Sequence, residues 1–360
     1  MKAIRQREHG GPDVLHWAET PAPRAEPDEV IVTVAASAVN RADLSQRQGR
    51  YPVPPGTVDI LGLECSGTIS SVGGEVTGWR IGDPVCALLT GGGYAQQVAV
   101  PADQLLPIPP GVSLLDAAAL PEAACTVYSN LVHDAGLDTG DTVLVHGGGS
   151  GIGTMAIQVI TAMGAQAVVT CGSDERARRC LELGATAAIN YRTTDFTDAV
   201  LDLTDGRGAD IALDCVGGPY LNRNIDALAV DGTLLVIGLQ GGNRTGIDLE
   251  PVMRRRLTIR GSTLRARPRH DKAHIVAGTE AHLWPLIAAG KIQPLIDSVV
   301  PMPHAARAHR RMEAGRQFGK ILLAAPTDDK HRDREDEKTE AHHAAVREFI
   351  PGDRGERDDA

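Results

Sequence analysis

One stretch of the chain, residues 143–163, constrains the fold more than any other, because it joins an apolar strand to an amphipathic helix through very small residues. Residues 142–145 are short and β-branched, as in a buried parallel strand. Glycines dominate residues 147–153, apolar residues then recur at helical spacing, and Gly164 ends the helix. Such a bare turn lets backbone N–H groups approach a pyrophosphate at the positive end of the helix dipole. The stretch predicts a cofactor-phosphate site, and a glycine turn that binds nothing is the alternative.

Strand-like and helical runs alternate after this turn at the spacing of repeated βα units. The strand-like runs are residues 167–170, 185–191, 210–216, 233–238 and 257–261, and the helical runs are residues 175–183, 195–203 and 219–229. This alternation predicts an α/β domain with a doubly wound parallel sheet. Ser150 stands where the dinucleotide-binding pattern often has its second glycine, and its side chain is small enough to be tolerated there.

The residues on both sides of this α/β unit have a different character. Residues 1–122 carry short strand signals between Gly and Pro residues, at 30–34, 67–72, 84–88 and 94–100, which predict a small β domain. After the α/β unit come a helical run at 270–289, a strand-like run at 292–300, a helix at 305–315 and a strand at 320–324. We expect these to rejoin the first domain. The predicted domains are therefore residues 1–122 with 265–326, and an inserted nucleotide-binding domain at 123–264.

Charge and composition exclude several classes of function. The net charge of −10 argues against nucleic acid or an anionic membrane as a partner. No apolar run is long enough for a transmembrane helix, and the first residues do not form a signal peptide. The six cysteines are scattered without a CxxC pair, which predicts reduced thiols that pack in a cytoplasmic protein.

The last part of the sequence, residues 327–360, is highly charged. It holds 12 Asp and Glu against 7 Lys and Arg, a difference of −5, and almost no apolar residues. This composition predicts a disordered tail. A short helix at 340–349 that docks on a partner is the alternative.

From Met1 to about Ala325 the chain resembles the zinc-independent NAD(P)H quinone oxidoreductases of the medium-chain dehydrogenase/reductase superfamily. The segments that carry the resemblance are GGPDVL, VNRADLSQRQGRYPVPPG, ILGLECSG, GGGYA, ALPEAACT, HGGGSGIGTMAIQ, INYRTTDF, DCVGGPYLNRN, VIGLQGG and LTIRGSTLRAR. The resemblance implies a Rossmann-type domain inserted in a GroES-like, β-rich catalytic domain, with the active site between them. It also implies a homodimer, for which we expect contact through edge strands such as residues 257–261.

The residues that bind zinc in related alcohol dehydrogenases are missing. Asn40 takes the place of a Cys, and Leu63 replaces the His of the GHE motif. No clustered cysteines follow between residues 88 and 120, so the structural zinc lobe is missing too. Without thiolate or imidazole ligands, the sequence predicts a metal-free enzyme.

The end of the second predicted strand, residues 168–173, indicates which nicotinamide cofactor binds. No Asp or Glu ends this strand to bind the ribose hydroxyls, and Asp174 fits better as the first residue of a helix. The resemblance places Arg176 and Tyr191 at the adenosine 2′-phosphate, with Ser173 as a hydroxyl donor, so NADPH is predicted. Arg176 as a solvated helix residue is the alternative.

Other cofactor contacts follow from the resemblance alone. Those expected near the pyrophosphate are Gly148, Ser150, Gly151, Ile152 and Gly153, those near the nicotinamide are Asn40, Gly238 and Leu239, and Lys320 is expected near the phosphates. Asp214 is interpreted as a carboxylate that caps a turn.

The predicted reaction is metal-free hydride transfer from NADPH to a quinone or other small electrophile. Tyr51, Asn40 and Asp43 are the candidates to stabilise the developing oxyanion, with Tyr51 first. Packing for Tyr51 and helix capping for Asp43 are the alternatives, and Tyr94 is a further candidate to border the pocket. The rival functions are NADPH-dependent reduction of an enone or enoyl double bond, and NADPH binding without turnover.

Overall fold

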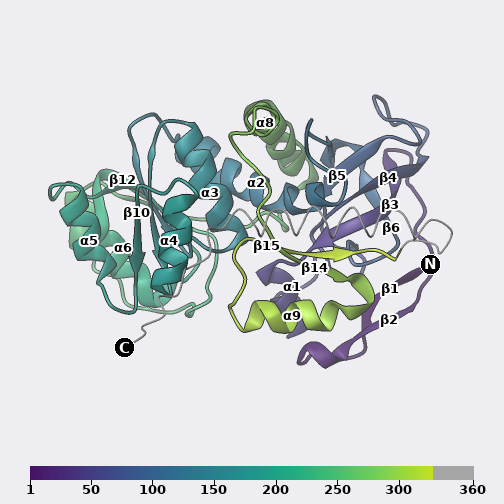
Figure 1. Ribbon diagram of the computed structural model, residues 1–360, viewed down its shortest axis with the longest axis horizontal. Helices are drawn as coiled ribbons and strands as arrows, with labels where there is room; N and C mark the ends of the chain where they lie inside the picture. Colours follow the sequence, from purple (N-terminus) through teal and green to yellow (C-terminus); the bar gives the residue numbers. More distant parts are fainter. Residues whose placement is uncertain (327–360) are drawn as a thin grey trace, which may run out of the picture. The chain divides into compact units, whose positions relative to one another are not determined.

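The computed structural model describes residues 1–326, and the predictions for residues 327–360 lie outside this part of the chain. A seven-stranded sheet has the order β14-β15-β3-β4-β5-β7, with β6 paired to β3 (Figure 1). Its strands are β3 (Glu29–Ala38), β4 (Glu64–Val72), β5 (Pro84–Leu88), β6 (Gln97–Pro101), β7 (Leu105–Pro107), β14 (Ile296–Pro301) and β15 (Lys320–Ala324). A separate hairpin joins β1 (Lys2–Gln6) to β2 (Leu15–Glu19).

The return of the chain to its first sheet is visible in the register of β15. Leu322 pairs with Ala38 and Ala324 with Ala36, antiparallel to β3. The seven-stranded sheet thus contains strands from both ends of the described chain, as the sequence predicts. The domain limits at 122/123 and 264/265 stay a prediction.

The second sheet has six parallel strands in the order β10-β9-β8-β11-β12-β13. They are β8 (Thr142–His146), β9 (Gln166–Cys171), β10 (Ala187–Asn190), β11 (Ala209–Asp214), β12 (Leu228–Val236) and β13 (Thr258–Gly261). The helices that follow the strands are α3 (Gly151–Ala162), α4 (Asp174–Glu182), α5 (Phe196–Leu203), α6 (Leu221–Ala227) and α7 (Leu249–Arg254). This is the predicted doubly wound α/β fold beside a β-rich domain.

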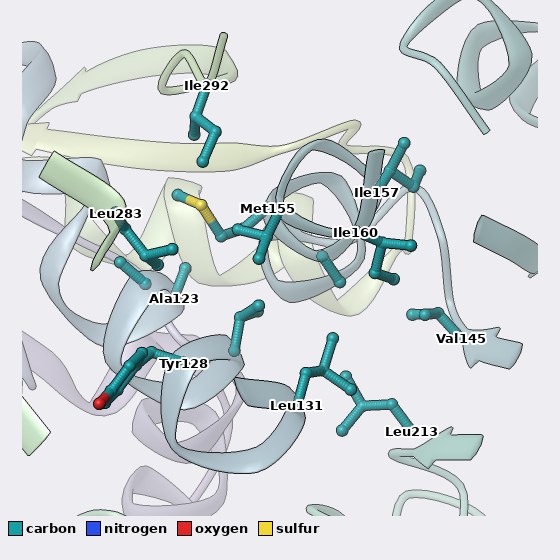
Figure 2. Close-up of a cluster of buried hydrophobic side chains, with 14 of the residues drawn as sticks. Ala123, Tyr128, Leu131, Val145, Met155, Ile157, Ile160, Leu213, Leu283 and Ile292 are labelled. Carbon is teal, nitrogen blue, oxygen red and sulfur yellow. The ribbon is translucent and has the colours of Figure 1, made fainter. Parts of the chain in front are cut away.

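Alternating side chains of the six-stranded sheet pack on opposite faces. Val143 and Val145 of β8 belong to a core that includes α2 (Pro121–Val127), its π-helical continuation Tyr128–Asp134, α3 and α8 (Arg269–Ala288). Leu144 instead packs against Phe196 of α5 and Ala227 of α6. Figure 2 shows the first core, in which Met155 and Ile160 of α3 lie near Leu131 and Leu283 from other helices. Burial on both faces explains why β8 is apolar throughout.

Several boundaries differ from the sequence-based expectations. The helix expected to reach residue 229 ends at Ala227, because β12 begins at Leu228 and pairs with Ala209 across an irregularity in the ladder. Asp231, with a φ of +64°, lies in this irregular part. The first strand expected after α8 begins at Ile296 rather than at residue 292, and β6 begins at Gln97 rather than Tyr94.

Two helices of the β-rich part complete the description. α1 (Arg41–Arg47), whose bounds the sequence analysis did not predict, follows β3 directly, and α9 (Ala305–Glu313) precedes β15. All six cysteines are free thiols, five of them buried. Within residues 1–326, no helix combines the length and the apolar character needed to cross a membrane.

Candidate active site

The glycine turn between β8 and α3 has the geometry of a phosphate cradle. Ser150 is the N-cap of α3, and its Oγ accepts a hydrogen bond from the Gly153 amide at 2.9 Å. A Cβ atom on Gly153 would lie 2.3 Å from the Gly147 carbonyl oxygen, and one on Gly148 would lie 2.8 Å from Val169. Larger side chains are therefore excluded where the backbone turns. Ser150 satisfies the Gly153 amide, and the other N–H groups at the start of the helix have no partner within it and can face a phosphate.

The start of β15 lies directly against this turn. The Gly319 amide donates to the Gly149 carbonyl oxygen at 3.0 Å. A Cβ on Gly151 would lie 2.4 Å from Cδ of Lys320, so the lysine stem packs on the first residue of α3. The cofactor turn and the seven-stranded sheet therefore meet at Lys320.

Lys320 ends in a buried polar cluster. Its Nζ donates to Asn40 Oδ1 at 2.7 Å and also to Glu64 Oε1, and both Lys320 and Glu64 are buried. Asn40 Nδ2 donates to the same Glu64 oxygen at 2.8 Å. The expected phosphate contact of Lys320 stays a prediction, because its ammonium here faces a carboxylate and an amide.

A second glutamate lies beside this cluster. The backbone N–H of Glu122, at the start of α2, donates to Glu64 Oε2 at 2.9 Å. Burial raises the pKa of the Glu122 carboxyl to about 7, against the opposing effect of Lys320. The sequence analysis missed both glutamates as site residues. Glu64 offered one signal, since it is a charged residue directly after the run Ile60-Leu61-Gly62-Leu63, which has no polar side chain.

Asp43 lies in the first turn of α1 rather than in a loop. Its carboxylate accepts hydrogen bonds from the backbone N–H of Asn40 at 2.8 Å, the backbone N–H of Gly62 at 2.9 Å and the Tyr94 hydroxyl at 3.2 Å. Asp43 is fully buried, and burial raises its pKa to about 6. The structure therefore shows the capping role that the sequence analysis gave as the alternative for Asp43, and contact with a substrate stays a prediction.

A chain of buried polar groups leads away from Asp43. Tyr94 Oη lies 3.3 Å from Nε2 of His309 on α9, and Nδ1 of the same histidine lies 3.2 Å from Nη1 of Arg47. Arg47 in turn forms an ion pair with Glu313. Burial lowers the pKa of His309 to about 3, with Arg47 adding to the effect, so the imidazole is neutral at pH 7. Tyr94 is thus fully buried and links α1 to α9 through its contacts with Asp43 and His309.

Tyr51, the first candidate for catalysis, lies in the irregular segment between α1 and β4. The guanidinium carbon of Arg265 is 5.4 Å from the centre of the Tyr51 ring. Burial raises the pKa of the Tyr51 hydroxyl, which stays protonated at pH 7. Sequence reasoning missed Arg265, which lies more than 200 positions from Tyr51 and has no local signal.

The predicted adenosine residues gather at the start of α4. Ser173 is the N-cap of this helix and accepts the Arg176 amide, and Asp174 is its first residue, as expected. Nη2 of Arg176 donates to the carbonyl oxygens of Gly315 and Gln317, the latter at 2.7 Å. The half-exposed Tyr191 brings its hydroxyl close to the backbone next to Ser173. The structure brings Ser173, Arg176 and Tyr191 together, and their contact with a 2′-phosphate stays a prediction.

The remaining predicted residues lie at the ends of β11 and β12. Asp214 accepts the amides of Val216 at 2.6 Å and Gly217 at 3.1 Å, which agrees with its interpretation as a turn cap. A Cβ on Gly238 would lie 3.0 Å from the Cys215 carbonyl oxygen, and Leu239 is exposed. Their place near a nicotinamide stays a prediction.

Possible metal ligands can be assessed over the same part of the chain. Across residues 1–326, no group of three or more His, Cys, Asp or Glu side chains is placed to hold a metal ion. At Asn40, which takes the place of a zinc-binding Cys, and at Glu64, the neighbour of Leu63, side-chain oxygens bind the ammonium of Lys320. A metal-free reaction stays a prediction that this arrangement favours.

Comparison with known proteins places the chain in a family. Two family models match, the alcohol dehydrogenase GroES-like domain over residues 26–110 and the zinc-binding dehydrogenase model over residues 151–277. A quinone oxidoreductase from Pseudomonas aeruginosa is 32% identical over 328 residues, which is 89% of this chain and 99% of the relative. The chain belongs to the quinone oxidoreductase family of the medium-chain dehydrogenase/reductase superfamily.

Solved structures of this superfamily share the fold along most of their length. The Escherichia coli quinone oxidoreductase complexed with NADPH has a TM-score of 0.81 and 30% identity, covering 90% of this chain and all of that one. An NAD-dependent alcohol dehydrogenase has a TM-score of 0.80 and 32% identity, covering 91% of this chain and all of that one. The CurK enoyl reductase has a TM-score of 0.79 and 26% identity, covering 90% of this chain and 99% of that one. Quinone oxidoreductases and an enoyl reductase thus have the same architecture as this oxidoreductase.

Proposed function

We propose that this chain is a metal-free reductase that transfers a hydride from NADPH to a quinone. The observation that carries the proposal is the Lys320 cluster, in which a buried ammonium joins Asn40 and Glu64 beside the glycine turn. The cluster places the positive charge of Lys320 beside Asn40, the position at which zinc-dependent relatives have a metal-binding Cys. The similarity to quinone oxidoreductases supports the choice of acceptor.

The residues of the glycine turn fit a dinucleotide. Gly148, Ser150, Gly151, Ile152 and Gly153 form a turn with no room for larger side chains at its tightest points, at the N-terminus of a helix. When bound, NADPH supplies the hydride. We assign Gly238 and Leu239 to its nicotinamide end and Ser173, Arg176 and Tyr191 to its adenosine end.

The protein would contribute position and polarity. Tyr51, protonated at pH 7, donates a hydrogen bond to the acceptor oxygen on which charge develops. Asn40, held between Lys320 and Glu64, is oriented by both and lines the nicotinamide side. Asp43 keeps Asn40 and Gly62 in place through their amides, so its role is to position the site.

Reduction of an activated carbon–carbon double bond is the second candidate. The CurK enoyl reductase and a 2-haloacrylate reductase share this fold at 26% and 27% identity. The same residues serve this reaction if the acceptor is an enone or enoyl compound, with Tyr51 as the proton donor. We also keep the predicted homodimer and cytoplasmic location as proposals.

Arg176→Gln tests the choice of cofactor. If Arg176 binds the 2′-phosphate, the variant loses about tenfold in kcat/KM for NADPH and little for NADH, because only the phosphate pairs with the guanidinium. The assay follows NADPH oxidation with 1,4-benzoquinone and with an enone, each repeated with a chelator. Arg178→Gln is the matched control, since Arg178 is exposed on the same helix and pairs with Glu175 and Glu182. An equal loss with NADH would contradict the assignment. NADPH binding without oxidation by any acceptor would favour the non-catalytic alternative.

A further inference from the structure

Arg265 is a buried cation without a carboxylate partner among residues 1–326. Arg265 comes shortly after β13 in the chain, and its exposed fraction is 5%. Nε donates to the Thr90 carbonyl oxygen at 2.7 Å. Nη1 and Nη2 have no hydrogen-bond partner within the described chain and are shielded from solvent. Most of the hydrogen-bonding capacity of this guanidinium is therefore unused.

Lys272 of α8 lies beside it. This lysine is 6% exposed, and its Nζ donates to Thr90 Oγ1 at 2.8 Å without a carboxylate within ion-pair distance in residues 1–326. Two buried cations thus converge on Thr90. Burial lowers the pKa of Lys272 and of Arg265, and the charge of Arg265 lowers the pKa of Lys272 further.

The nearby charged groups do not neutralise this pair. Asp103, which faces Lys272, is engaged by Arg269, and Arg269 also binds Asp28. Arg265 is influenced by Tyr51, Asp43 and Asp59, none of which forms an ion pair with it in the described structure. The Asp43 carboxylate is already bound by two amides and a hydroxyl.

Two other buried cations of the described chain have the carboxylate partner that Arg265 and Lys272 lack. Lys320 pairs with Glu64, and Arg47 pairs with Glu313. Buried charges are retained in proteins when they are paired, because an isolated one is strongly disfavoured. Arg265 and Lys272 depart from this rule next to Tyr51, which indicates that their partner is a ligand.

The ring of Tyr51 lies over the guanidinium of Arg265. Tyr51 belongs to an irregular segment without a sheet or helix ladder of its own. Movement of this segment would open the side of the guanidinium that faces Tyr51, and the fork of Nη1 and Nη2 matches the two oxygens of a carboxylate. The aromatic face then remains beside any planar, conjugated body attached to that carboxylate.

We propose that Arg265 and Lys272 form a carboxylate-binding subsite, so that the natural acceptor is an acidic, planar conjugated compound whose body packs on Tyr51. This inference rests on the proposed function and narrows it: the acceptor is a quinone or enone that bears a carboxylate. Arg265 orients the acceptor, and Tyr51 serves both as cover and as hydrogen-bond donor.

Binding of benzoate, compared with its neutral isostere benzamide, tests the subsite without turnover. Calorimetry on the full chain, with and without saturating NADPH, should give at least about tenfold tighter binding of benzoate. Arg265→Met should abolish this preference, Lys272→Met should reduce it several-fold, and Arg265→Lys should retain part of it. Arg260→Gln is the matched control: it removes one positive charge from the same segment, the partner Asp134 keeps its ion pair with Arg267, and the preference should stay unchanged.

Several results would overturn the proposal. Equal affinity of the wild-type protein for benzoate and benzamide would do so without any variant, even if Arg265→Met did not fold. An equal loss in Arg260→Gln would indicate general electrostatics. A tenfold loss of NADPH affinity in Arg265→Met, with benzoate binding intact, would assign the cation to a cofactor phosphate. Benzoate selectivity without quinone turnover would contradict the proposed function alone, and quinone turnover without selectivity would contradict the subsite alone.

Discussion

Lys320 and Arg265 are both buried cations in the β-rich half of the site, and their surroundings differ in one respect. Lys320 has a carboxylate and an amide oxygen as partners, whereas Arg265 has a single carbonyl oxygen. A cation with internal partners holds the protein together, because removing it leaves a buried anion behind. A cation without them is available to a ligand. We therefore distinguish residues that stabilise the structure of the site, such as Lys320, from residues that bind the substrate, as proposed for Arg265.

The largest expected effect is on stability. Lys320→Met leaves Glu64 buried without its cation, and we expect the free energy of unfolding to fall by about 3–5 kcal/mol. Arg265→Met leaves no carboxylate without a partner, so the free energy of unfolding of this variant should change by about 1 kcal/mol or less. Urea denaturation of both variants measures the contrast.

A double variant checks the reason for this contrast. Lys320→Met combined with Glu64→Gln removes the unpaired anion and should regain most of the loss. Equal destabilisation by Lys320→Met and Arg265→Met would remove the distinction between the two cations.

Tyr51→Phe separates the two roles given to Tyr51. The variant keeps the ring beside Arg265 and removes the hydroxyl, so kcat/KM for the acceptor should fall about tenfold or more while benzoate affinity stays within about twofold. Steady-state kinetics and calorimetry on one preparation measure both. Lost benzoate affinity with unchanged turnover would reverse the assignment.

The smallest effect concerns Glu122, the second carboxylate near Lys320. In the native state the pKa of Glu122 is raised from 4.5 to about 7, so the side chain stays neutral there while the same group ionises in the unfolded chain. The stabilising effect of the neutral acid is therefore complete below the ordinary pKa and is lost as the pH rises to the folded pKa of about 7. Glu122→Gln removes this loss. The variant should match the wild type at pH 5 and be about 1–2 kcal/mol more stable at pH 8.

Unfolding by denaturant across this pH range makes the measurement. Asp43 and Asp214 also have a pKa raised to about 6 and titrate in both proteins. Asp214 cancels in the difference, and Asp43 enters it only through its repulsion of the Glu122 carboxylate. A difference that is already complete at pH 5 would show that the side chain, and not its charge, is responsible.

Sequence reasoning worked best where the structure is local. The strand, glycine turn and helix of residues 142–162 form from neighbouring residues, so their pattern in the sequence is direct evidence. The alternation of strands and helices after them was recognised for the same reason. The bounds of the short helix α1 were not predicted, although its capping box of Asn40 and Asp43 is local and helix capping was given as the alternative for Asp43. The other partners of Asp43, at residues 62 and 94, have no local signal.

The buried polar residues could not be predicted in this way. Lys320 and Glu64 are 256 positions apart, and Arg265 reaches Thr90 across 175 positions. The first pair depends on the return of β15 to the sheet that contains β4, and the second depends on how the segment after β13 meets the β-rich part, which no local pattern encodes. Resemblance supplied Tyr51 and Asn40 as candidates, but the contrast between a paired and an unpaired cation required side-chain contacts.

The pairing of β15 with β3 also sets the order in which a growing chain can be completed. Besides β4 and β6, β3 (Glu29–Ala38) pairs through its last residues, Ala36 to Ala38, with β15 (Lys320–Ala324), almost at the end of the described chain. At about 5–20 residues per second, ribosomal synthesis leaves β3 without this neighbour for roughly 15–60 seconds. During this interval Glu64 has no lysine, and the edge of the first sheet is open to other strands. A newly made chain therefore depends on late contacts for its site, and protection of that edge during synthesis would govern its yield.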